Sequence, residues 1–132
     1  MNTDTNTGVD LSLWQLIDDA KSLVDGGAGL RFEVEAPKSP NSISNAMLPA
    51  FVLQYDGQSF AYLNQCAHVA MEMDWQHGVF FDLDQRFIMC ATHGALYEPE
   101  SGLCVAGPCT GEQLKSVPLM THHGKLYAAR TV

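Results

Sequence analysis

Two short segments of the chain each hold one cysteine and one histidine at close spacing. The first reads CAH over residues 66–68, and the second reads CATHG over residues 90–94. Thiolates and imidazoles are the usual protein ligands of zinc and of iron–sulfur clusters. Each segment follows an apolar stretch typical of a β-strand, so each is expected in a loop at a strand end. Two such loops, facing each other, would offer two thiolates and two imidazoles to one metal centre.

The spacing within these segments bears on the choice of metal. Structural zinc sites usually pair their ligands as C-x₂₋₄-C and H-x₃₋₅-H, so C-x-H with C-x-x-H fits zinc poorly. In one class of [2Fe–2S] cluster, two cysteines bind one iron and two histidines bind the other. Neutral imidazole carries less negative charge than thiolate, so this ligation favours the reduced state relative to an all-cysteine cluster. A structural zinc-binding module stays as the remote alternative.

The two segments and the residues after them resemble the Rieske [2Fe–2S] family. The similarity includes CAH, the stretch CATHGALYEPESG and a later Gly107-Pro108, and it spans at least residues 62–118. It implies an all-β fold, a small antiparallel sandwich or barrel with a cluster-binding subdomain of two ligand loops. It also implies one [2Fe–2S] cluster per chain, with four ligands: Cys66, His68, Cys90 and His93.

The resemblance gives roles to residues around the ligands. High-potential family members have Ser two residues after the second histidine and Tyr two further on, and both hydroxyls donate to cluster sulfur or a ligand thiolate. Here Ala95 cannot donate and Tyr97 can, so we expect a potential below that of the cytochrome-complex type. Gly94 completes the second motif. In the family, the Gly-Pro that matches Pro108, followed here by Cys109, belongs to a loop that covers the cluster.

The sequence also departs from parts of the family. Cytochrome-complex Rieske proteins carry a disulfide between their ligand loops, but Met71 and Thr92 occupy the matching positions. The chain therefore looks like a soluble Rieske ferredoxin. The gap between the two ligand segments is a few residues longer than usual, and the extra length is expected within residues 71–78. Cys104 and Cys109 are expected to be buried packing thiols. A redox-sensitive thiol is the alternative, and a 104–109 disulfide is not expected in a reducing compartment.

Period and turn signals predict the elements that position these loops. Apolar spacing over residues 13–24 favours one short N-terminal helix or helical turn. Residues 30–34 alternate as a strand does. Three hairpins are expected, one around Asp56-Gly57, one over 79–90 and one over 115–131 that turns at His122-His123-Gly124. Those turn histidines, and His77, are expected to be exposed.

The chain has 132 residues, 46% of them hydrophobic, which suits one domain with a real core. We expect a disordered tail over residues 1–10 and a single domain over residues 11–132, with the cluster-binding part at about 62–112. Seven basic residues against fifteen acidic ones give a net charge of -8, which argues against nucleic acid and anionic membrane surfaces as partners. Without a signal peptide or an apolar span, a cytoplasmic location is expected.

These features predict an electron-transfer protein that acts between a flavin reductase and an oxygenase or similar acceptor. Ring-hydroxylating oxygenases need a further domain with a mononuclear iron, for which this length leaves no room, so we do not expect an enzyme by itself. One alternative is an electron-transfer subunit of a larger oxidoreductase, such as a component of a dioxygenase-type system. A regulatory protein that senses redox state is the other, and it rests on Cys104 and Cys109 alone.

Overall fold

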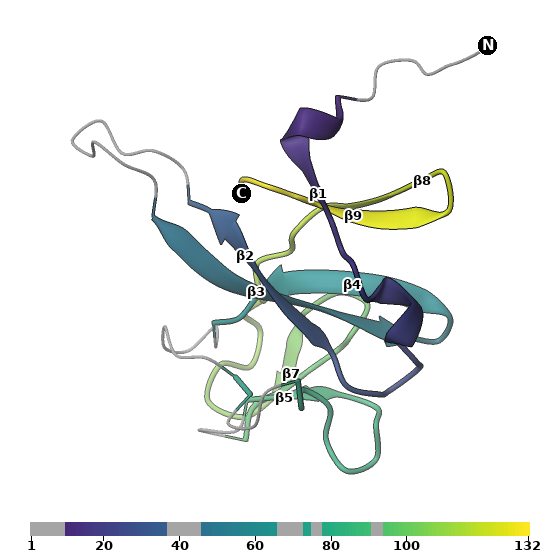
Figure 1. The fold of residues 1–132 in the computed structure, drawn as a ribbon. Coiled ribbons are helices and arrows are strands. Elements are labelled where there is room, and N and C mark those ends of the chain that lie inside the picture. The colour runs from purple at the N-terminus through teal and green to yellow at the C-terminus, as the bar shows by residue number, and fades with distance from the viewer. Residues whose placement is uncertain (1–9, 37–45, 66–72, 75–77, 91–93) are drawn as a thin grey trace.

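A computed structural model describes residues 10–36, 46–65, 73–74, 78–90 and 94–132. These residues form three small antiparallel sheets, with two 3₁₀ turns near the N-terminus. The sheets are layered, as Figure 1 shows, with the sheet β2-β3-β4 in the middle. The prediction of an all-β sandwich is therefore confirmed. Among the described residues, no helix is long and apolar enough to cross a bilayer.

The central sheet contains the strands β2 (Leu30–Glu35), β3 (Met47–Tyr55) and β4 (Gln58–Leu63). The β3–β4 hairpin turns at Asp56 and Gly57, whose φ angles of 52° and 77° lie in the left-handed region. The Asp-Gly pair predicted this turn correctly, because glycine and aspartate tolerate that region better than other residues.

Strand β3 supplies both hydrophobic cores of the protein. Side chains alternate across a strand, so its buried run divides by face. Phe51 and Leu53 join one core, whereas Ala50 and Val52 join the other. This is why the run Ala50–Leu53 is apolar without a polar alternation: both of its faces are covered.

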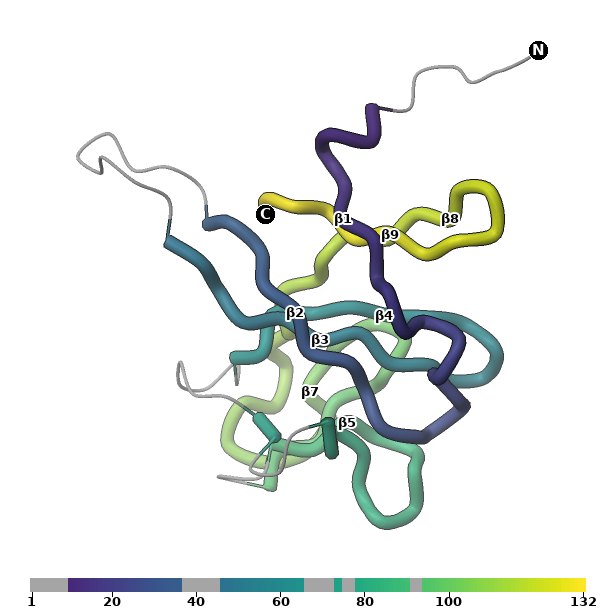
Figure 2. The backbone as a smooth tube through the Cα atoms, in the orientation of Figure 1, coloured from purple at the N-terminus to yellow at the C-terminus, as the bar shows by residue number. Residues whose placement is uncertain are grey.

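The second sheet covers one face of the central sheet and brings the chain ends together. It contains β1 (Trp14–Leu16), β9 (Lys125–Ala129) and β8 (Leu119–His122), in that order. The β8–β9 hairpin confirms the prediction for residues 115–131, with its turn at His123 and Gly124. Figure 2 follows the chain from β1 at its start to β9 at its end, side by side.

The helical prediction for residues 13–24 is only partly right. The structure has two 3₁₀ turns, η1 (Leu11–Leu13) and η2 (Ala20–Ser22), on either side of β1. Three residues of the predicted helix instead pair with β9. A helix of about 12 residues is marginal in water, since nucleation is costly, so an available strand edge decides the conformation.

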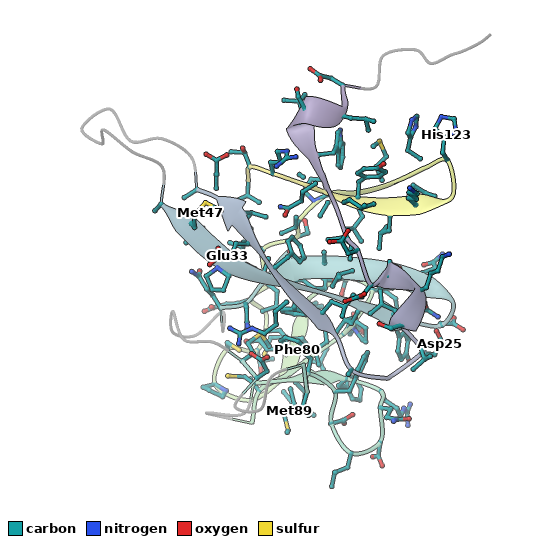
Figure 3. The ribbon with its side chains drawn as sticks, viewed as in Figure 1. Asp25, Glu33, Met47, Phe80, Met89 and His123 are labelled. Carbon is teal, nitrogen blue, oxygen red and sulfur yellow. The ribbon has the colours of Figure 1, made fainter. Side chains whose placement is uncertain are left out.

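The third sheet covers the other face of the central sheet, and Cys90 directly follows its first strand. Its strands are β5 (Ile88–Met89), β6 (Leu96–Tyr97) and β7 (Cys104–Ala106). The hairpin predicted over residues 79–90 is present but shorter than predicted. Phe81 and Ile88 make an isolated bridge, and Asp82 N–H donates to Phe87 O at 2.9 Å. Phe80 stacks on Phe51 with ring centroids 4.0 Å apart, which joins this part to the central sheet (Figure 3).

Candidate metal centre

Cys90 follows β5 directly and begins a closed reversal of the chain. Its N–H donates to Ala95 O at 2.9 Å, and Gly94 N–H donates to Cys90 O at 2.8 Å. Gly94 has a φ of 68°, a conformation that favours glycine. Cys90 and Ala95 are both fully buried. The backbone of Cys90 is therefore held by hydrogen bonds, and its side chain is shielded from water.

A buried polar network anchors the chain on both sides of the first ligand segment. The Asn64 side chain donates to Asp74 Oδ1 at 2.8 Å and accepts from Met73 N–H at 2.8 Å. The other Asp74 carboxylate oxygen accepts from Gly78 N–H at 3.0 Å and lies 3.7 Å from Arg31 Nε. Asn64 is fully buried, and Asp74 is 5% exposed. Asn64, before Cys66 and His68 in the sequence, is thus tied to Met73 and Asp74 after them, and Asp74 to Gly78.

The segment Gly107-Pro108-Cys109 lies against the reversal that begins at Cys90. A Cβ atom added to Gly107 would stand 2.8 Å from Ala95 Cα, so the two backbones touch with no room for a side chain. Gly107 also has a φ of 100°. Pro108 is exposed and Cys109 is buried. The tight contact gives Gly107 two independent reasons to be glycine.

The Tyr97 hydroxyl, expected to be a hydrogen-bond donor near the cluster, lies 3.0 Å from Cys109 Sγ. Tyr97 is fully buried on β6, and its neighbours in one core include Cys90, Ala95 and Cys109. A third thiol, Cys104, lies 2.9 Å from Cys109, sulfur to sulfur. The prediction that Cys104 and Cys109 are buried is confirmed, whereas the contact between Cys109 and the Tyr97 hydroxyl was not predicted.

Tyr62 holds the loop after β6 against the central sheet. Its hydroxyl donates to Pro99 O at 2.6 Å, and Gly102 lies so close that an added Cβ would stand 2.8 Å from the Tyr62 ring. Burial, reinforced by the negative charge of Glu100, raises the pKa of Tyr62 to about 12. The phenol therefore stays protonated, as the hydrogen bond requires.

The structure gathers part of the predicted site. Cys90, Ala95, Tyr97 and Cys109 share one core, with Gly94 and Pro108 exposed at its margin. The remaining site residues named from the sequence lie outside the described residues: Cys66, His68, Met71, Thr92 and His93. So do His77 and the tail to residue 9.

Sequence reasoning missed Asn64, Asp74 and Arg31. A signal for Asn64 existed, because a polar residue directly after a buried strand and two positions before a ligand cysteine is well placed to fix a loop. Asp74 gave no such signal, since an aspartate in a polar stretch is usually solvated. Only the tertiary contact with Asn64 distinguishes it.

The described part of the site fits a bound iron–sulfur cluster. A fully buried cysteine at a strand end suits a soft thiolate ligand in a water-poor setting. Together, fold and site define a small all-β domain with a buried motif cysteine at a strand end. Among the described residues, no group of three or more His, Cys, Asp or Glu side chains could hold a metal ion, so the cluster is assigned by comparison with known proteins.

The family follows from comparison with known proteins. The model of the Rieske [2Fe-2S] domain matches residues 14–128, so the chain belongs to the Rieske [2Fe–2S] domain family and binds a [2Fe–2S] cluster. No curated protein sequence matches the chain.

Solved structures share the fold. One is a chain of a complex of reduced oxygenase and oxidised ferredoxin in carbazole 1,9a-dioxygenase, at 20% identity and a TM-score of 0.62, covering 90% of this chain and 94% of that one. Another is the ferredoxin of carbazole 1,9a-dioxygenase from Nocardioides aromaticivorans IC177, at 16% identity and a TM-score of 0.58, covering 87% and 92%. A longer chain of a reduced oxygenase–ferredoxin complex matches at 16% identity and a TM-score of 0.62; this chain covers 28% of it.

Proposed function

We propose that the protein carries single electrons from a flavin reductase to an oxygenase or a similar acceptor. The observation that carries this proposal is the near-complete overlap with a ferredoxin: 87% of this chain and 92% of the Nocardioides protein superimpose. A fold shared over both whole chains favours a carrier of the same kind. When bound, the cluster supplies a centre that gains and loses one electron.

We assign the cluster ligands to the two motif segments: Cys66, His68, Cys90 and His93. Cys90 has direct support from its burial and from the two hydrogen bonds that fix its backbone. The other three follow from the C-x-H and C-x-x-H spacing. Cys109 is buried in the same core as Cys90, and the Tyr97 hydroxyl lies 3.0 Å from the Cys109 sulfur.

Electron paramagnetic resonance of the dithionite-reduced protein tests the ligand set. We expect the rhombic signal of a cluster with mixed ligands, with an average g value below that of all-cysteine clusters. His68→Ala and His93→Ala should each lose this signal. His122→Ala is the matched control, because His122 lies on the β8–β9 hairpin, in the layer opposite the third sheet. A colourless, zinc-loaded protein that stays silent after dithionite would refute the proposal.

Electron delivery is tested by mixing the reduced protein with the oxidised oxygenase of a carbazole 1,9a-dioxygenase in a stopped-flow instrument. We expect the reduced cluster to reoxidise without oxygen present, while the oxygenase becomes reduced in equal amount. A protein that retains a normal cluster and passes no electron to this oxygenase or to other oxygenase components would contradict the carrier role.

A second candidate is an electron-transfer subunit or domain of a larger oxidoreductase. It is favoured by the match to 28% of a much longer chain in an oxygenase–ferredoxin complex. Purification from native cells separates the two: a carrier elutes alone, and a subunit elutes with its enzyme through high salt.

A cytoplasmic location also belongs to this proposal. Its support is the use of cysteine: Cys104 and Cys109 are not joined by a disulfide although their sulfurs lie 2.9 Å apart. Cell fractionation followed by immunodetection tests it, and recovery in an extracytoplasmic fraction would contradict it.

A further inference from the structure

Cys104 and Cys109 form a buried pair of thiols that the cluster ligation does not use. Cys104 begins β7, and Cys109 lies three residues beyond the end of that strand. Each is 1% exposed. The Cys109 thiol donates to Cys104 Sγ at 2.9 Å, and the Cys104 thiol donates to Ala106 O at 3.2 Å.

The backbone around these thiols holds them face to face. Cys104 N–H donates to Glu112 O at 2.7 Å, and Gly111 N–H donates back to Cys104 O at 3.0 Å. Glu112 N–H also donates to Cys109 O at 2.9 Å. The turn that contains Cys109 is therefore tied to the strand residue Cys104 itself. The contact between the sulfurs is a consequence of the backbone and not of one side-chain rotamer.

Little movement separates this pair from a covalent bond. A disulfide has a sulfur–sulfur distance of about 2.05 Å, so the two atoms need to approach by less than about 1 Å. Gly107 lies between them and Gly111 follows Cys109, and their φ angles of 100° and 95° are accessible chiefly to glycine. Such a turn can adjust without straining a side chain.

We propose that Cys104 and Cys109 are a redox modification site that forms a reversible disulfide with hydrogen peroxide as the oxidant. The Cys109 thiolate attacks one peroxide oxygen, which breaks the O–O bond and leaves a sulfenic acid and, after protonation, one water. The Cys104 thiol then attacks the Cys109 sulfur and releases the second water. In total, two thiols lose two electrons and two protons, and one peroxide becomes two waters.

Cys109 is the sulfur better placed for the first step. With Cys109 donating to Cys104, the Tyr97 hydroxyl can donate to Cys109 Sγ across their 3.0 Å contact. A hydrogen bond donated to sulfur favours its anionic form, which is the nucleophile. Exposed residues, Pro108 and Thr110, flank Cys109 in the chain. A small neutral oxidant therefore needs only a local opening of this turn to reach the thiol.

The disulfide is expected to alter the contacts of the chain next to Cys90, which is assigned as a cluster ligand. Oxidation removes both thiol hydrogens, so Tyr97 becomes the only possible donor in its contact with Cys109. The same turn touches Ala95 through Gly107. The formation of the disulfide does not rest on the proposed electron-carrier function, whereas any change at the cluster rests on the presence of the cluster.

The test uses the cluster-loaded protein, treated with hydrogen peroxide in small excess and then denatured with a thiol-alkylating reagent. Trypsin releases one peptide, Phe87–Lys115, which contains Cys90, Cys104 and Cys109. We expect this peptide to lose two alkyl groups, with fragmentation placing the bond between Cys104 and Cys109 while Cys90 is alkylated. Dithiothreitol should restore both alkyl groups. The paramagnetic resonance signal, recorded before and after, reports whether the cluster survived and whether its environment shifted.

Two variants sharpen this test. Cys104→Ser should abolish the bond and leave Cys109 as an over-oxidised monothiol at higher peroxide. Val105→Ser, at the neighbouring exposed position of β7, is the matched control and should keep the bond. Three outcomes with the wild-type protein would overturn the proposal: a disulfide to Cys90, sulfonic acid at Cys109 without a disulfide, or full alkylation at peroxide levels that already destroy the cluster.

Discussion

Asn64 and Asp74 are buried polar residues that supply each other with a hydrogen-bond partner. Both side chains are buried: Asn64, just after β4, binds Met73 and Asp74, and Asp74 also accepts from Gly78 N–H. Buried polar groups are stabilising only while their partners are in place. The pair therefore links the residues on either side, in the sequence, of the segment with Cys66 and His68.

Replacing Asn64 with Ala should destabilise the protein by about 2–4 kcal/mol, since the Asp74 carboxylate and Met73 N–H both lose a buried partner. Denaturant unfolding followed by circular dichroism measures this loss. Gln113→Ala is the control. Within the described part of the chain, the Gln113 side chain makes one exposed hydrogen bond of 3.4 Å, to Ser101 O, so its removal should cost less than about 0.5 kcal/mol. Equal losses of stability from both changes would contradict a stabilising role of the Asn64–Asp74 pair.

At Ala95, a Ser side chain should raise the reduction potential by a few tens of millivolts. The added hydroxyl can donate to cluster sulfur, and a difference of about 1 kcal/mol between oxidation states corresponds to about 40 mV for one electron. Protein-film voltammetry measures the shift. Ala128→Ser places the same change at a buried site in the other core and should leave the potential unchanged. A lower potential in the Ala95 variant would contradict the expected role.

Tyr62 predicts a loss of stability at alkaline pH. Its pKa is raised to about 12 in the folded protein by burial and by Glu100, against 10 for the free side chain. Between these two values the unfolded chain binds fewer protons than the folded one, so the free energy of unfolding falls as pH rises from 10 to 12. Unfolding midpoints across this range should fall less steeply in Tyr62→Phe. An unchanged slope in that variant would assign the loss to other groups.

Two turns of the protein require glycine for different physical reasons. Gly57 in the β3–β4 turn has a φ of 77° with no atom near an added Cβ, whereas Gly107 has a φ of 100° and also touches Ala95. Gly57→Ala should therefore cost about 1 kcal/mol, through backbone strain alone.

Gly107→Ala should cost more than Gly57→Ala, by about 1–3 kcal/mol, because the new methyl group must displace the reversal that follows Cys90. It should also speed the loss of the cluster's visible absorbance on warming, an effect absent from Gly57→Ala. Equal unfolding costs and equal rates of cluster loss would indicate that the segment 107–109 does not cover the site.

The whole molecule predicts how its partners approach. A net charge of -8 attracts basic surfaces over about 30 Å at 0.01 M ionic strength and over only about 8 Å at 0.15 M. The second-order rate of electron transfer to cytochrome c, a basic acceptor, should fall at least several-fold between about 0.01 and 0.15 M ionic strength. With ferricyanide, an anionic acceptor, the rate should rise instead. The same salt dependence for both acceptors would exclude steering by net charge.

The hairpins were predictable because their signals are local. Asp56-Gly57 and the pair His123-Gly124 set their own turns through residues that tolerate positive φ. The N-terminal stretch was harder, because its helical spacing competes with the free edge of β9, which no local pattern reveals. The second hairpin lies between these cases: its apolar runs are present, but Phe81 makes only one bridge before the chain leaves the sheet.

The family and its cluster could be predicted from the sequence alone, since the motif residues and their spacing are written along the chain. Only the tertiary structure decided that Asp74 binds Asn64, that Gly107 touches Ala95, and that Cys104 meets Cys109 beside Tyr97. The physical reason is the same in each case. These contacts join residues by packing and hydrogen bonding across turns and sheets, and neither side chain of a pair carries a sign of its partner.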